Sequence, residues 1–217
     1  MEQTITIFIY IHAFFGGVGL IAGILSIITK KGSALHKKTG KLFSIGMMAS
    51  SLISLPIAWM PNHENLFLFL IGLFTMYLVL AGNRALSFKS KHKKEADWAD
   101  KTISGSMLFF SVIMTTLGIY GIATGVTNSI LFLFFGAFGL FMTIKDFRFF
   151  KTFTNTKNSW LTTHISKIIG AFIASITAFI VAGLGIGSLI AWITPTILGT
   201  LYIIYWNRKI KVKPVTR

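Results

Sequence analysis

Residues 66–88 read LFLFLIGLFTMYLVLAGNRALSF, and this stretch decides the fold class. It carries no charged residue before Arg84, and a helix of this length crosses a hydrocarbon core of about 30 Å. Comparable apolar runs lie at residues 4–29, 42–60, 104–125, 128–150, 160–182 and 186–207. The sequence therefore predicts an all-α protein: a polytopic membrane helix bundle with seven transmembrane helices in a single domain, residues 1–217.

The composition agrees with a membrane protein. The chain is 53% hydrophobic and only 12% charged, with a mean hydropathy of +0.72, whereas soluble domains carry about 25% charged residues. There is no cysteine, which excludes disulfides and thiolate metal sites. The N-terminal stretch has no basic region and no cleavage signal, so we expect a retained first span rather than a signal peptide.

Basic residues set the expected orientation. The 21 lysines and arginines all fall on the side reached after the first, third, fifth and seventh crossings, in groups of five, six, five and five. The connections after the even-numbered spans, PNHEN, TGVTNS and GLGIG, contain none. Because positive loops stay in the cytoplasm, we predict a multi-pass protein of the cytoplasmic (inner) membrane with its N-terminus outside and its C-terminus in the cytoplasm. The net charge of +15 then indicates contact with anionic headgroups and not with nucleic acid.

His164 and Lys167 lie one helical turn apart near the cytoplasmic start of the sixth predicted span. Their spacing places both on one helix face, which continues through small residues toward Ala174 and Ala178. We expect this face to point into the bundle, and Lys167 to reach upward to the headgroups with its long stem.

Asp146 is the one acidic residue that the sequence places near a predicted span. It follows Gly136, Gly139 and Thr143 on a small-residue face, and a buried carboxylate there needs a cationic partner. The candidate partners are Arg84, Lys145 and Lys167.

Several titratable side chains share this predicted depth: His36, Arg84, Asp146, His164 and Lys167. Two interpretations are open. They form helix-end ion pairs and headgroup contacts without chemistry, or they line a polar cavity that opens to the cytoplasm.

His12 is a separate candidate in the outer half of the first span. Gly16, Gly19 and Gly23 follow on its face, so we expect a tightly packed neighbouring helix there. The imidazole either rests on a hydroxyl or carbonyl of that neighbour or takes part in a proton relay or ligand site.

The motifs exclude several chemistries. There is no HExxH motif, no carboxylate pair within a predicted span and no GxSxG elbow, so we predict no catalytic residue and no metal site. Haem b needs two axial ligands at matched depth, and His36 with His164 is the pair that the sequence offers. Pro56 and Pro195 lie within predicted spans and indicate either kinks or broken helices.

IHAFFGGVGLIAGI, LHKKTGK, LVLAGNRAL and WLTTHISKIIGAFIASITAF together resemble a family of bacterial integral membrane proteins classed as a domain of unknown function. The resemblance covers most of the chain, through the sixth span. It implies these pattern positions: His12, His36, Arg84, Trp160 and His164. Lys167 and Ile168 stand where the family pattern implies Arg and Met, which keeps the charge but loses a bidentate fork. The resemblance implies no reaction.

The function that these residues predict is binding or translocation of a small solute, ion or proton through a cytoplasm-facing polar cavity. The alternatives are a membrane redox protein that binds haem b or quinone, and a non-catalytic sensor or scaffold subunit. The candidate residues are His12, His36, Arg84, Asp146, His164 and Lys167.

Overall fold

The computed structural model describes residues 2–90, 92–153, 156–210 and 213–214. Seven helices in this part of the chain are long and apolar enough to cross a membrane, as predicted. Two short strands of two residues each pair in antiparallel fashion. The helices are α1 (Glu2–Ile28), α2 (Ala34–Ile57), α3 (Leu66–Ala85), the 3₁₀ segment η1 (Leu86–Lys89), α4 (Trp98–Ala123), α5 (Ser129–Thr152), α6 (Ser159–Ala178), the π-helical η3 (Phe179–Gly183) and α7 (Leu189–Lys209); the strands are β1 (Thr156–Lys157) and β2 (Lys213–Pro214).

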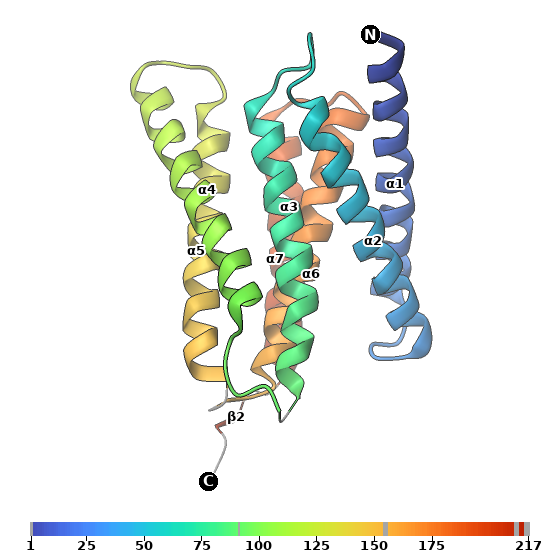
Figure 1. Cartoon of the computed structure of the whole chain (residues 1–217), viewed down its shortest axis with the longest axis vertical. Helices are drawn as coiled ribbons and strands as arrows, with labels where there is room; N and C mark the ends of the chain where they lie inside the picture. Colours follow the sequence, from blue (N-terminus) through green and yellow to red (C-terminus); the bar gives the residue numbers. More distant parts are fainter. Residues whose placement is uncertain (1, 91, 154–155, 211–212, 215–217) are drawn as a thin grey trace. The chain divides into compact units, whose positions relative to one another are not determined.

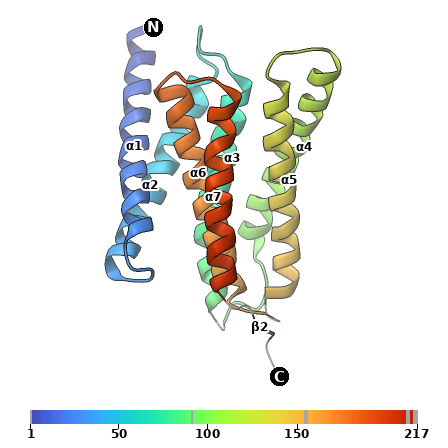
Figure 2. The ribbon, with the colours of Figure 1, turned by 180° about the vertical axis from the view of Figure 1, so that it is seen from behind.

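The chain divides into two compact units. The first contains the residues up to Val79 and Ser166–Trp206, and the second contains Leu80–Ile165 and the residues from Asn207 onward. Each unit is built around one helical hairpin. Figures 1 and 2 show α1 beside α2 in the first unit and α4 beside α5 in the second, from both sides.

Two helices begin earlier than the apolar runs predicted. α2 begins at Ala34 rather than residue 42, where the hydroxyl of Ser33 accepts a hydrogen bond from the backbone N–H of His36. α4 begins at Trp98 rather than residue 104, after an Asp97 cap. Hydropathy marks the part of a helix that suits hydrocarbon, whereas capping side chains mark where the helix itself starts.

The two prolines do not break their helices. α7 continues through Pro195 without interruption, and α2 ends at Ile57, directly after Pro56. The broken-helix interpretation of the seventh span is therefore wrong, because the helix continues on both sides of the ring.

Glycines bring α1 and α2 into backbone contact, as predicted from the Gly16, Gly19 and Gly23 stripe. A Cβ atom added to Gly46 would lie 2.9 Å from both the Cα of Gly19 and the carbonyl oxygen of Phe15. Such distances leave no room for any side chain at Gly46. The small residues thus set how closely this hairpin packs.

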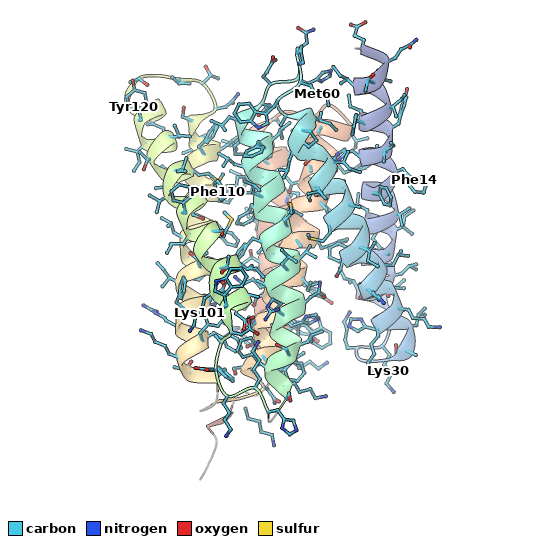
Figure 3. The ribbon with its side chains drawn as sticks, in the orientation of Figure 1. Phe14, Lys30, Met60, Lys101, Phe110 and Tyr120 are labelled. Atoms are coloured by element: carbon cyan, nitrogen blue, oxygen red, sulfur yellow. The ribbon has the colours of Figure 1, made fainter. Side chains whose placement is uncertain are left out.

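The opposite face of α1 is apolar and exposed. Tyr10, Phe14, Ile21 and Ile28 are between 63% and 70% exposed and share one helix face. Figure 3 shows Phe14 projecting outward from α1. A row of large apolar side chains suits hydrocarbon and not water, which is the expected surface of a membrane-spanning helix.

Glycines also bring α4 and α5 into backbone contact. A Cβ atom added to Gly118 would meet the backbone nitrogen of Leu133 and lie 2.6 Å from its Cα, and one added to Gly136 would lie 2.6 Å from the backbone nitrogen of Thr115. Ser111 and Thr143 between them are fully buried. Close backbone approach along the whole hairpin fixes the register of α4 against α5, and so the positions of its polar side chains.

Two glycines of α4 provide a matched test of this packing. Gly118→Ala should destabilise the protein by about 1–3 kcal/mol, because its methyl group meets backbone that has to move. Gly105→Ala meets nothing within 4 Å and should be neutral or stabilising by up to about 1 kcal/mol through helix propensity. Thermal unfolding of the two purified variants in the same detergent measures the difference. Equal melting temperatures would contradict the close-packed interface.

Candidate functional site

A small cavity in the second unit is the candidate site. The C-terminal end of α3, the first turns of α4, the C-terminal half of α5 and the first turn of α6 surround it. Its polar lining residues are Arg84, Asp100, Ser104, Asp146 and Thr163, and its apolar lining residues are Ala81, Ala85, Phe88, Ile103, Phe149 and Phe150. The cavity measures about 10 Å³, room for about one water molecule.

Asp146 lies on the small-residue face of α5, as predicted, and is only 3% exposed. The hydroxyl of Ser104 on α4 donates a hydrogen bond to the Oδ2 atom of Asp146 over 2.9 Å. Both partners are buried, so the close α4–α5 packing decides the geometry of this contact. It presents the carboxyl group to the cavity.

Arg84 pairs with two other carboxylates, Asp97 and Asp100. Its Nε lies 2.6 Å from Oδ1 of Asp100 and its Nη2 lies 2.6 Å from Oδ2 of Asp97. Lys93 completes the group, with its Nζ 2.6 Å from Asp100 and 3.2 Å from Asp97. We call these four residues the ion-pair network. Among the three cations predicted as partners of Asp146, Arg84 thus forms its ion pairs elsewhere, and Lys145 lies over the Phe141 ring at 5.0 Å.

Sequence reasoning missed the acidic half of this network. Asp97 and Asp100 form a capping box at the start of α4, in which each side chain accepts a hydrogen bond from the backbone N–H of the other. The spacing of the two aspartates in DWAD was the available signal. In the sequence, Asp97, Trp98 and Asp100 fit either a short interfacial helix or a solvated turn, because the apolar run of the fourth span begins only at residue 104.

All three candidate histidines use the same ring nitrogen in the same way. The Nδ1 atom of His12 lies 2.9 Å from the carbonyl oxygen of Ser50. The Nδ1 atom of His36 lies 3.0 Å from that of Ser26, and the Nδ1 atom of His164 lies 2.8 Å from that of Gly82. A carbonyl oxygen only accepts, so Nδ1 carries a hydrogen in each of the three rings. For His12 this matches the interpretation of an imidazole that rests on a neighbouring helix.

Lys167 does not reach the headgroups, which corrects the expectation from its long stem. It is only 2% exposed in the first unit. Its Nζ donates a hydrogen bond to the Tyr77 hydroxyl and lies 4.2 Å from the centroid of that ring. The Tyr77 phenol accepts a hydrogen bond from the Lys167 ammonium group and also presents its π face to it. Both contacts stabilise the buried position of the Lys167 side chain.

The six candidate residues therefore divide between the two units. Arg84, Asp146 and His164 belong to the second unit, where Arg84 and Asp146 line the cavity and His164 binds the backbone two residues before Arg84. The first unit contains the other three: His12, His36 and Lys167. The cavity in the second unit is accordingly the site that this structure describes.

Comparisons with known proteins gave no match, whether to a family model, a curated protein or a solved structure. The resemblance drawn from the motifs accordingly stays a prediction.

The network makes Asp97 unusually acidic. The pKa of its carboxyl group is lowered from 3.8 to about 2, first by the hydrogen bond from the Asp100 N–H, then by the hydrogen bond and charge of Lys93 and the charge of Arg84, against an opposing effect of burial. A lowered pKa stabilises the folded protein above pH 3.8, and this contribution is lost as the pH falls through about 2.

Replacing Lys93 with Gln should raise the pKa of Asp97 toward 3.8, because one charge-assisted hydrogen bond is lost. Carbon NMR of the labelled aspartate carboxyl groups measures this pKa, with Asp97→Asn to assign the signal. The exposed neighbour Lys94 provides the control Lys94→Gln, which should leave the titration unchanged. An Asp97 pKa that is the same in both variants would contradict the described geometry.

Proposed function

We propose that this protein binds and transfers protons across its membrane, with Asp146 as the proton-accepting group at the cytoplasmic end. The observation that carries the proposal is the cavity lined by two buried carboxylates, Asp100 and Asp146, on facing helices. Buried ionisable groups inside membrane helices are expensive and are typical of proton and ion pathways.

The size of the cavity favours a proton among the small solutes. About 10 Å³ accepts roughly one water molecule but no organic solute. A single water molecule between Asp146 and the network is sufficient for proton exchange, since it donates and accepts at once. The proposal therefore narrows the predicted solute, ion or proton to the smallest of the three.

Each side chain then has a defined task. The Asp146 carboxylate takes the proton, and the hydroxyl of Ser104, which donates to it now, can rotate and accept once the carboxyl group is protonated. Arg84 and Lys93 pair with Asp97 and Asp100 in the network, so the second buried carboxylate of the cavity has two cationic partners.

Haem b, the alternative cofactor, is supported to a lesser degree. A ring whose Nδ1–H is held by a carbonyl oxygen resembles a metal-ligating histidine, which usually donates its second nitrogen in this way. The cavity of the second unit, however, is far smaller than a porphyrin. We therefore retain proton transfer as the proposed function.

The proton-binding role is tested with Asp146→Asn, which keeps the shape of the side chain but does not titrate. Proton uptake into proteoliposomes, driven by a potassium diffusion potential and followed with a trapped pH dye, should fall by about 100-fold or more. The carboxylic-acid band in the infrared spectrum of the acidified protein should lose one component. Asp146→Glu should retain part of the flux, and Glu64→Gln, an exposed loop carboxylate, should retain all of it. Unchanged flux and an unchanged band in Asp146→Asn would refute the proposal.

The proposed orientation places the cavity on the cytoplasmic side. The ends of α3, α4, α5 and α6 that surround it are those joined to the basic connections, and positive loops remain inside.

Orientation is tested directly because the chain has no cysteine. A single Thr127→Cys, exposed between α4 and α5, should react with a membrane-impermeant thiol reagent added to intact cells. Glu95→Cys, exposed before α4, should react only after the cells are permeabilised. The reverse pattern would show that the N-terminus is cytoplasmic.

A further inference from the structure

We propose that the ion-pair network is a latch that holds the cavity closed and controls access to Asp146. This inference rests on the proposed function, because the cavity that the latch closes is the proposed proton site. The network consists of Arg84, Lys93, Asp97 and Asp100, and it joins the C-terminal end of α3 to the N-terminal end of α4.

The network is fully cross-linked. Each of the two cations contacts both carboxylates, with the four distances between 2.6 and 3.2 Å. The charges of the four side chains cancel, so the closed arrangement leaves no excess charge next to the membrane. Removing any single member leaves an unpaired charge and weakens the two contacts that it made.

Members of the network are also walls of the cavity. Arg84 and Asp100 both line it. The Nζ atom of Lys93 lies 4.0 Å from the centroid of the Phe88 ring, which is a third wall. Phe88 in turn packs edge-to-face on Phe149 and Phe153. Breaking the contacts between Arg84 and Asp100 or between Lys93 and Phe88 would therefore widen the cavity on this side.

The exposure of one half of the network favours a latch that can open over a permanently closed one. The side chains of Arg84 and Asp97 are 31% and 53% exposed, so water and salt compete for this half of the network. The other half, Asp100 with Lys93, is mostly buried and sets the closed position.

Access to the cavity is measurable with one reporter cysteine. Ala85 lines the cavity and is only 2% exposed, so Ala85→Cys in the full-length, detergent-purified protein should react slowly with a small methanethiosulfonate reagent. Adding Lys93→Gln should raise the labelling rate by at least about tenfold, because removing one partner of a buried pair strongly destabilises the closed state. Adding Lys94→Gln, an exposed lysine next to it in the chain, should leave the rate unchanged.

Equal labelling rates in the Lys93→Gln and Lys94→Gln proteins would overturn the latch. If Lys93→Gln does not remain monodisperse, Asp97→Asn answers the same question at a half-exposed position, with the exposed Glu95→Gln as its control; equal rates in that pair would again overturn the latch. The infrared band of Asp146 separates the two proposals. Equal labelling rates together with an Asp146 band in the infrared spectrum would reject the latch but not proton binding. Absence of that band would reject proton binding, whatever the labelling rates are.

Discussion

Burying a carboxylate between membrane helices costs free energy, and this cost is the main constraint on the structure of the second unit. Asp100 and Asp146 are both 3% exposed. The structure solves the problem differently at the two sites. Asp100 has two cations and a place in the first turn of α4, where the helix dipole favours negative charge. Asp146 accepts a hydrogen bond from a serine hydroxyl on the facing helix. Removing a partner of Asp100 would cost about 3–5 kcal/mol, as for other buried pairs.

This difference between two nearby carboxylates underlies the functional argument. Asp100 forms ion pairs with Arg84 and Lys93 and joins α3 to α4. Asp146 accepts a hydrogen bond from Ser104 and lines a cavity of one-water size, and it is the group that we propose for proton exchange. Pairs of acids that differ in their surroundings commonly divide into a permanent charge and a working group.

Glycine packing makes the arrangement possible. The hydrogen bond between Ser104 and Asp146 requires α4 and α5 to lie close together along their length, and Gly118 and Gly136 permit that approach. α1 and α2 use Gly19 and Gly46 in the same way, and there the product is the contact between His12 and Ser50. Lipid supplies no hydrophobic force between helices, so close packing and interhelical hydrogen bonds have to stabilise them.

The sequence by itself determined the number of spans, the helical class and the polar residues worth attention, because a bilayer imposes length and hydropathy on each segment separately. It also located the small-residue face of Asp146, which depends only on helical period. The early starts of α2 and α4 escaped it, since caps lie outside the apolar runs. Only the tertiary structure decided that Arg84 binds Asp97 and Asp100, that Lys167 turns inward to Tyr77, and that the cavity has room for about one water. Those outcomes depend on which helix faces approach each other, and hydropathy contains no term for the contact between two faces.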